Sequence, residues 1–267
     1  MKGEFLKYDQ LDFSRAVSSN LVSAKALFCI RAVVSCHLVA VFIATLYVSA
    51  RDNVFYMVPT TFTNLSNIGL TAYYLTATYH SFMFLQTKTL DSLTKQHWLL
   101  TVFLWFLYGT VVVYHIVVPA IYWGMLFDPN NTMDVLNKYV DFSHHGADLA
   151  CMLIEVLFNR MELFFVHIIG TWAFIILYMF LAWVYFAARG EWLYSFLDWN
   201  QGPMAAAWYI GLLVIFGLLF VFQLYLHRGR DRVFSARRAS VAAKEGALKS
   251  KYQTTHEVQS RSVGEKA

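Results

Sequence analysis

Residues 97–126 read HWLLTVFLWFLYGTVVVYHIVVPAIYWGML, a run that contains no Asp, Glu, Lys or Arg. About 20 apolar residues in a helix are enough to cross roughly 30 Å of bilayer hydrocarbon, so this stretch predicts a membrane-spanning helix. The composition of the 267-residue chain agrees, because 58% of its residues are hydrophobic and only 14% are charged. Soluble domains are usually about 45–50% apolar and about 25% charged. The composition therefore excludes an ordinary soluble globule, and it excludes intrinsic disorder of the whole chain.

Further apolar segments on both sides of this stretch are long enough to span a bilayer. The predicted spans lie at residues 28–50, 55–86, 97–126, 142–158, 161–187 and 204–227. The fourth is the most polar, which predicts a helix that faces the interior of a bundle. The predicted fold class is an all-α, polytopic transmembrane helix bundle of about six spans, and five or seven spans remain as alternatives.

The charge pattern predicts three parts of the chain. These are a cytosolic N-terminal segment at residues 1–27, the helix bundle at 28–227 and a disordered basic tail at 228–267. The tail carries ten Lys or Arg and four Asp or Glu, which favours binding to anionic lipid headgroups and not to nucleic acid. The distribution of basic residues predicts that both termini are cytosolic, in the endoplasmic reticulum or the plasma membrane. Arg31 is expected to snorkel to the cytosolic surface.

Two polar clusters fall early in the second and fourth predicted spans, and both are expected at the same end of the bundle. One is TTFTNLSN at residues 60–67, and the other is SHHGAD at residues 143–148. Polar residues inside a membrane are costly and usually functional. These residues make a candidate hydrolytic site in which His145 takes the proton of Thr63, a nucleophile that is weak without a base.

The supporting residues of this predicted site have separate roles. Asn64 or a backbone N–H would stabilise the oxyanion. Asp148 or Glu155 would orient the imidazole of His145, as the third member of a catalytic triad does. The loop at residues 191–199 is expected at the same end of the bundle.

Other interpretations of the same residues stay open. Thr and Asn can hold helices together by hydrogen bonds without any catalysis. His144 and Asp148 share a helical face and, with His115, would make a zinc site that activates water. The site is predicted to hold no metal and the protein to use no cofactor. The motifs GxSxG, HExxH, GxGxxG and the P-loop do not occur, so the chemistries that depend on them lack sequence support. Asn130 begins an Asn-Asn-Thr sequon in a predicted external loop, a possible glycosylation site.

Three short blocks of the sequence resemble one family of membrane proteins. They are Phe62-Thr63-Asn64-Leu65, the segment HGADLACMLIE from His145 to Glu155, and the segment from Gly190 to Trp199, which ends in Leu-Asp-Trp. In this order and rough spacing they resemble the androgen-induced proteins, the androgen-dependent TFPI-regulating proteins and the related rolling stone proteins. The resemblance covers about residues 30–225.

The resemblance implies a function as well as a fold. The androgen-induced branch consists of multi-pass hydrolases that cleave fatty acid esters of hydroxy fatty acids with an intramembrane threonine and a histidine. Carried over to this chain, these roles fall on Thr63 and His145. The Leu-Asp-Trp block and the FTN context are closer to rolling stone, for which roles in fusion are suggested. A non-enzymatic protein of adhesion, fusion or scaffolding is therefore the alternative, with a metal-dependent intramembrane hydrolase as a second alternative.

Overall fold

The computed structural model describes residues 6–264, with side chains described as far as residue 237. The regular elements of this part of the chain are all helical, and it contains no strand. The longer helices are α1 (Ala24–Arg51), α2 (Phe62–Thr87), α4 (Trp98–Ile121), α5 (Val135–Phe142), α6 (Asp148–Phe158), α7 (Ile168–Arg189) and α8 (Pro203–Gly264). Short helical elements join them: η1 (Tyr8–Gln10), η2 (Phe13–Ala16), η3 (Phe55–Met57), α3 (Asp91–Thr94), η4 (Tyr122–Leu126), η5 (Ser143–Ala147), η6 (Phe165–His167), η7 (Ser195–Leu197) and η8 (Trp199–Gln201).

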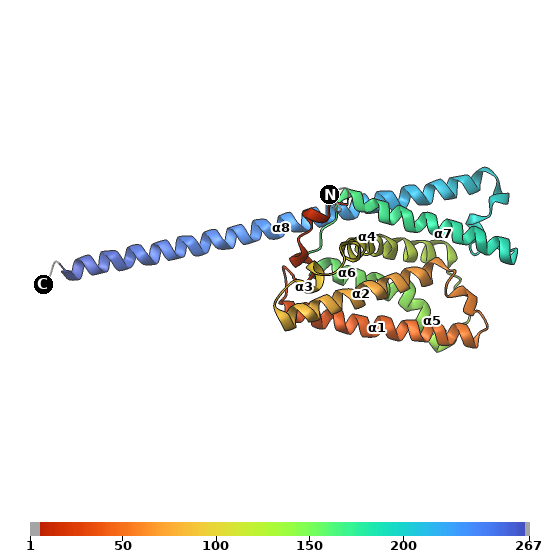
Figure 1. Cartoon of the computed structure of the whole chain (residues 1–267), viewed down its shortest axis with the longest axis horizontal. Helices are drawn as coiled ribbons and strands as arrows, with labels where there is room; N and C mark the ends of the chain where they lie inside the picture. The colour runs from red at the N-terminus through yellow and green to blue at the C-terminus, as the bar shows by residue number, and fades with distance from the viewer. Residues whose placement is uncertain (1–5, 265–267) are drawn as a thin grey trace. The chain divides into compact units, whose positions relative to one another are not determined.

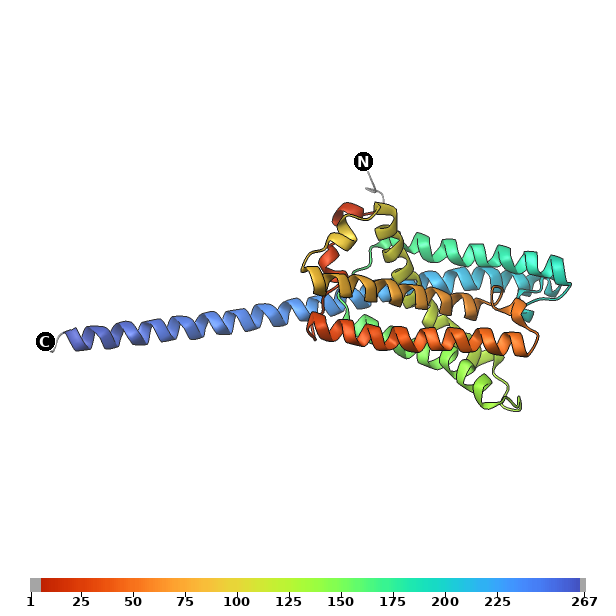
Figure 2. The same ribbon diagram turned by 60° about the horizontal axis from the view of Figure 1, so that its bottom comes forward.

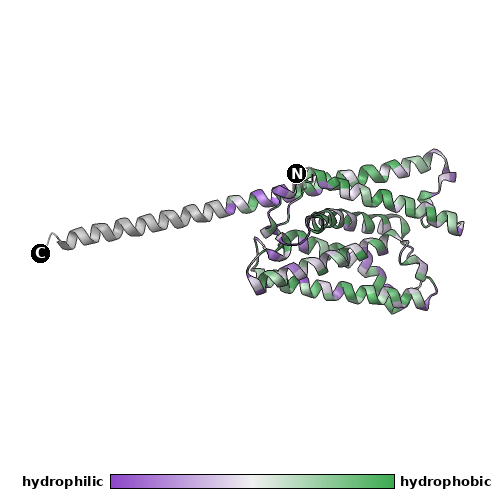
Figure 3. Cartoon of the chain, viewed as in Figure 1, coloured by the Kyte–Doolittle hydropathy of each residue, from purple (hydrophilic) through white to green (hydrophobic). Residues whose placement is uncertain are grey.

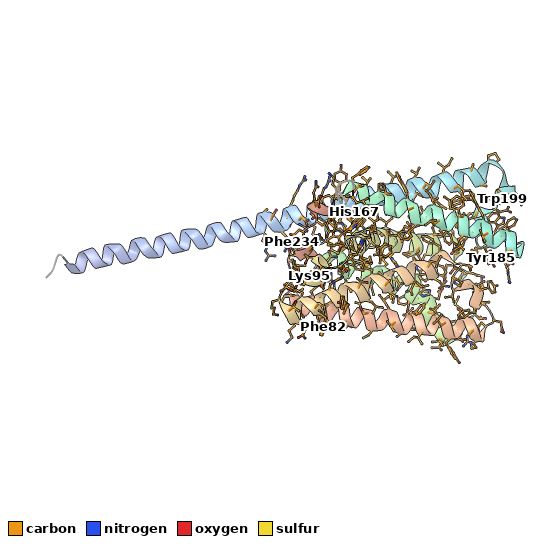
Figure 4. All side chains as sticks on the ribbon, viewed as in Figure 1. Phe82, Lys95, His167, Tyr185, Trp199 and Phe234 are labelled. Atoms are coloured by element: carbon orange, nitrogen blue, oxygen red, sulfur yellow. The ribbon has the colours of Figure 1, made fainter. Side chains whose placement is uncertain are left out.

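Residues 6–225 form a bundle whose successive long helices run in alternating directions (Figures 1 and 2). The helix pairs α1/α2, α2/α4, α4/α6 and α4/α7 pack against one another. We name one end of the bundle the 52–61 end and the other the 88–97 end, after the loops that lie there. In Figure 4, Tyr185 and Trp199 lie at the 52–61 end, and Lys95 lies at the 88–97 end.

Four helices are long and apolar enough to cross a membrane, namely Ala24–Arg51, Trp98–Leu126, Phe165–Arg189 and Pro203–Arg237. Their apolar character is visible as the green ribbon in Figure 3. The predicted all-helical, multi-pass class is therefore supported, but the count of six spans is not confirmed. Two of the six predicted spans, 55–86 and 142–158, are not among these four helices. Both segments bury polar side chains: Asn67 and Thr71 in the first, and His144 and Asp148 in the second.

The disordered tail is not confirmed either, because α8 continues as a helix to Gly264. The chain has no proline after Pro203, so nothing in the tail blocks helical hydrogen bonding. Many of its residues are Ala, Lys, Arg, Glu and Gln, which have high helix propensity. Residues 226–264 belong to a structural unit separate from the bundle.

The helix ends are set by local hydrogen bonds. The Ser23 hydroxyl accepts a hydrogen bond from Ala26 N at the start of α1 (3.2 Å), and Thr61 does the same for Asn64 N at the start of α2 (3.4 Å). The Asp134 carboxylate accepts from two backbone N–H groups at the start of α5. Gly190 ends α7 with a φ of 74°, a left-handed conformation that favours glycine.

A buried ion pair joins three helices near the 88–97 end. Arg31 on α1 and Glu155 on α6 both have fully buried side chains, and Arg31 Nε lies 3.1 Å from Glu155 Oε1. Arg31 also donates to Ala16 O and to the hydroxyl of Ser81 on α2, each at 2.7 Å. The prediction that Arg31 snorkels to the surface is therefore wrong. A guanidinium with a carboxylate and further acceptors inside the bundle does not need to reach water.

The remaining acceptor capacity of the Glu155 carboxylate is also used. Tyr73 Oη donates to it at 2.7 Å, and Asn159 Nδ2 donates at 3.1 Å. Tyr74 on α2 donates its hydroxyl to the backbone oxygen of Cys151 on α6. Because its donors and acceptors are paired, the network costs less to bury than an isolated ion pair and fixes the register of α1, α2 and α6.

We expect Glu155→Ala to destabilise the protein by about 3–5 kcal/mol, because it leaves the Arg31 guanidinium buried without its carboxylate. Chemical unfolding in detergent would measure this. The double variant Arg31→Met/Glu155→Leu should lose less stability than Glu155→Ala, since no unpaired charge remains. Lys95→Ala is the matched control, because Lys95 and Asp91 form an exposed pair and its loss should cost less than about 0.5 kcal/mol. Equal effects of Glu155→Ala and Lys95→Ala would contradict the structural role of the buried pair.

Candidate functional site

Thr63 lies in the first turn of α2, on the wall of a small cavity at the 52–61 end. The cavity encloses about 50 Å³ and is lined by α2, α4, η4, α7, α8 and the 190–202 loop. Its lining is mostly apolar, and the hydroxyl-bearing side chains are Thr63, Tyr122, Tyr178 and Tyr194. A hydroxyl nucleophile here would meet the reacting end of a lipid in apolar surroundings.

The 190–202 loop carries Tyr194 to Thr63. The phenolic oxygen of Tyr194 accepts a hydrogen bond from Phe62 N at 3.2 Å, and the Tyr194 side chain lines the same cavity as Thr63. The loop is held by aromatic packing, with Trp192 stacked on Phe186 at 4.2 Å between ring centroids. The sequence-based expectation that this loop lies at the end of the bundle that holds Thr63 is confirmed.

His145 lies in η5, a π-helical turn between α5 and α6. Such turns interrupt α-helices and are frequent at functional sites. Its Nδ1 lies 2.9 Å from Asp141 O and 3.2 Å from the carboxylate oxygen Asp141 Oδ1. Both neighbours are acceptors, so Nδ1 carries the proton and Nε2 keeps the lone pair that a general base needs. Trp123 fixes the same turn by donating its indole N–H to His145 O at 2.8 Å.

Tyr122 stands between these two predicted site residues. Its ring is stacked on the His145 imidazole, with 3.5 Å between the centroids and planes 6° apart. Its hydroxyl donates to Asp141 Oδ2 at 2.7 Å, and the side chain also lines the Thr63 cavity. His145 itself lines a different, polar cavity. The structure therefore brings Thr63 and His145 to the same end of the bundle but does not place them in contact.

The predicted supporting residues have other partners. Asn64 donates its side-chain N–H to Met57 O at 3.1 Å, which ties the start of α2 to the preceding loop. Glu155 pairs with Arg31, so it does not orient His145. Asp148 accepts from Asn67 Nδ2 at 2.9 Å, and its Oδ2 lies 3.9 Å from His115 Nε2.

Asp141 is the carboxylate that orients His145, and the sequence analysis missed it. It precedes His145 by four residues, the spacing that places two side chains on one face of a helix. The sequence alone shows the spacing of Asp141 and His145. It does not show that Tyr122 and Tyr194 belong to the site, because each comes from a different segment of the chain.

The predicted zinc ligands do not converge. His144 Nε2 lies 3.3 Å from the Thr45 hydroxyl, whereas Asp148 lies near His115. Among the residues that the structure describes, no group of three His, Cys, Asp or Glu side chains is placed to hold a metal ion. His144, Asp148 and His115 therefore do not form the three-ligand site that the zinc alternative needs.

A polar cavity opens beside His144 and His145 at the 52–61 end. Arg51 bridges two carboxylates at its rim, with Nε 2.7 Å from Asp52 Oδ1 and Nη2 2.6 Å from Asp134 Oδ2. The hydrogen bond from Arg51, helped by Asn137, lowers the pKa of Asp52 below its ordinary value. The backbone N–H of Asn137 and the Arg51 side chain lower the pKa of Asp134. This clasp joins the end of α1 to the start of α5.

A further cavity of about 280 Å³, called the second cavity below, lies between α2, α4 and α7. It shares Phe62 and Tyr178 with the Thr63 cavity. The rings of Phe62 and Tyr178 lie 5.0 Å apart, and Tyr114 lies 5.0 Å from Phe62, so these aromatic side chains separate the two spaces. Asn130 is exposed in a turn, and the next two residues of its sequon, Asn131 and Thr132, line the polar cavity.

Comparison of the chain with family models, with curated proteins and with solved structures found no match. The resemblance to the androgen-induced and rolling stone proteins therefore stays a prediction, and the site has to be interpreted from its own geometry.

The clasp predicts a pH dependence of stability. Because the folded-state pKa values of Asp52 and Asp134 are lowered, the clasp stabilises the fold above the ordinary carboxyl pKa near 3.8. This contribution should be lost as the pH falls through the lowered values. The difference in unfolding midpoint between wild type and Arg51→Met should therefore be present at neutral pH and vanish in acid. A difference in unfolding midpoint that stays constant down to about pH 2 would contradict the role of the clasp.

Proposed function

We propose that this protein is a multi-pass membrane lipid hydrolase that cleaves long-chain fatty acid esters, with fatty acid esters of hydroxy fatty acids as the substrate class. The observation that carries the proposal is the position of Thr63 on the wall of a mostly apolar cavity, together with Tyr178 and Tyr194. An apolar cavity with a few polar groups at one place is the usual form of a site for a small apolar ligand. The histidine–carboxylate pair His145–Asp141 at the same end supports it.

The reaction would proceed through an acyl-threonine. Thr63 Oγ1 adds to the ester carbonyl carbon while its proton passes to His145 Nε2. The tetrahedral intermediate collapses, the C–O bond to the alcohol breaks, and the leaving hydroxy fatty acid takes the proton from His145. Water then adds to the acyl-threonine, gives a proton to His145 and releases the free acid. The proton finally returns to Thr63, so the enzyme is regenerated.

Two features of the geometry set the conditions for this reaction. The Tyr122 ring has to turn away from His145, or a water has to relay the proton, because Tyr122 lies between the base and the nucleophile. Tyr178 supplies a candidate oxyanion donor in place of Asn64. Its hydroxyl is buried at the wall of the Thr63 cavity and makes no hydrogen bond of normal geometry.

The membrane arrangement is part of the proposal. Six spans with both termini in the cytosol would place the 52–61 end, and with it Thr63 and Asn130, on the lumenal or external side. The host membrane would be the endoplasmic reticulum or the plasma membrane. The basic residues after 227 would then face anionic lipid headgroups on the cytosolic side.

A non-enzymatic membrane protein of adhesion, fusion or scaffolding is the second candidate. It is favoured by the separation of Thr63 from His145 and by the way buried polar groups, such as Asn67 with Asp148, link one helix to another. In this case Thr63 and His145 would serve stability only. A metal-dependent hydrolase finds no support in the positions of His115, His144 and Asp148.

We expect Thr63→Ala and His145→Ala to abolish ester hydrolysis and labelling by a fluorophosphonate probe in membranes that contain equal amounts of each protein. Thr63→Ser should retain hydrolysis, because it keeps a hydroxyl. Thr87→Ala is the matched control, since the Thr87 hydroxyl is exposed and bonds only near its own helix end. Full hydrolysis by either alanine variant would contradict the mechanism. Absence of labelling in the folded wild type would favour the non-enzymatic candidate.

Tyr178→Phe tests the oxyanion donor. It removes only the hydroxyl, so folding should be unchanged while the turnover number falls by about 10²–10³-fold, as for the loss of one oxyanion-hole donor. Steady-state kinetics on one ester would measure this. Tyr139→Phe is a suitable control, because Tyr139 is exposed and lies outside the cavity. An unchanged turnover number in Tyr178→Phe would remove the tyrosine from this role.

A further inference from the structure

The second cavity is lined mainly by apolar side chains, with the hydroxyls of Ser66 and Thr110 among them. It is lined by Leu65, Gly69 and Ser66 on α2, by residues of α4 that include Leu107, and by Leu177 and Leu181 on α7, and no charged side chain lines it. Leu177 at its rim is 62% exposed, so the space opens between the helices to the outer surface of the bundle. In a bilayer that surface meets lipid chains and not water.

A separate hollow lies next to this cavity toward the 88–97 end and shares Leu107 with it. It extends along α2 past Leu75 to Tyr79, opposite Leu100 on α4, and Thr76, His80 and Gln96 are among its polar lining residues. From residue 62 to residue 79 α2 rises by about 25 Å, at about 1.5 Å per residue. We call the two hollows together the α2/α4 groove. Its length is close to the roughly 30 Å thickness of the bilayer hydrocarbon.

The shape and lining of the groove select its occupant. A helix is about 10–12 Å across with its side chains, too wide for a cavity of about 280 Å³. A single extended acyl chain needs apolar walls and no hydrogen bonds, and the groove offers such walls along most of its length, with His80 and Gln96 as polar side chains near the 88–97 end. At the 52–61 end the groove shares Phe62 and Tyr178 with the Thr63 cavity. A chain that lies in the groove therefore ends at the aromatic side chains that border the Thr63 cavity, and its ester has to pass between them to reach Thr63.

Gly69 lies on the floor of this groove. A Cβ atom added there would lie 3.8 Å from Leu107 Cδ1 and 3.9 Å from Val111 Cγ1, ordinary contact distances. A larger side chain would extend beyond these atoms into the groove. Residue 69 follows Thr63 by six positions, or about 9 Å along the helix axis. A leucine there would leave space for a short chain only.

We propose that the α2/α4 groove holds the acyl chain of the lipid ester that is cut at Thr63, and that Gly69 determines how long a chain the groove accepts. This rests on the proposed hydrolase function for the position of the ester. To that function the proposal adds that the acyl chain runs from Thr63 toward the 88–97 end. It also adds that the lipid enters the bundle from the side, through the gap between α2, α4 and α7.

The test compares palmitoyl and octanoyl esters of one alcohol, hydrolysed by the full-length protein in lipid vesicles. Gly69→Leu should lower the ratio of palmitoyl to octanoyl hydrolysis by at least about tenfold, the scale of discrimination that a reshaped hydrophobic pocket gives. Leucine also has a higher helix propensity than glycine, so folding should not suffer. Gly211→Leu is the matched control, because a Cβ at Gly211 meets nothing within 4 Å. An unchanged ratio in Gly69→Leu would overturn the proposal.

A second readout does not depend on catalysis. A palmitoyl ester with a diazirine at the end of its chain would be photo-crosslinked to the Thr63→Ala protein, and the labelled residues would be mapped by mass spectrometry. We expect labels around Leu75 and Leu100 that are lost in Thr63→Ala/Gly69→Leu. Labels elsewhere in the bundle would overturn the groove even if the wild type hydrolyses esters. Labels in the groove without hydrolysis by the wild type would support the groove and refute the proposed enzyme.

Discussion

The ion pair between Arg31 and Glu155 is the constraint on which the arrangement of the bundle depends. Both side chains are fully buried, in helices more than a hundred residues apart in the sequence. A charge in such surroundings is tolerated only when its partner and its remaining hydrogen bonds are in place. Ser81, Tyr73 and Asn159 complete the set. α1, α2 and α6 can therefore pack in only one register without leaving a charge or a donor unpaired.

That register positions the candidate site at the opposite end. The Asn67–Asp148 hydrogen bond and the Arg51 clasp continue the polar contacts between the same helices toward the 52–61 end. They hold the start of α2, with Thr63, and the turn η5, with His145, at one end of the molecule. Tyr122 lies between them, because its ring is stacked on His145 and also lines the Thr63 cavity. A catalytic reaction at this site would therefore depend on a movement of Tyr122 or on a water that relays the proton past it.

The two kinds of space in the bundle suit an amphiphilic ligand. The cavity beside His144 and His145 is lined by charged and amide side chains, whereas the Thr63 cavity and the α2/α4 groove are lined by apolar ones. Tyr122 and the aromatic side chains around Phe62 divide these spaces. A lipid ester has the same division between a polar group and an apolar chain. This shared division is the reason for proposing a lipid ester as the substrate.

The sequence by itself determined the helical membrane class. That class depends on composition and on the length of apolar runs, and both can be counted in the sequence. It also identified Thr63 and His145 as polar residues near one end of the bundle, since a helix converts position in the sequence into depth. The partners were decided only by tertiary structure. Arg31 pairs with Glu155, Asp148 with Asn67 and the backbone N–H of Phe62 with Tyr194, each across distant segments. The side to which a buried side chain turns depends on which helix packs there, and no periodicity in one segment specifies its neighbour.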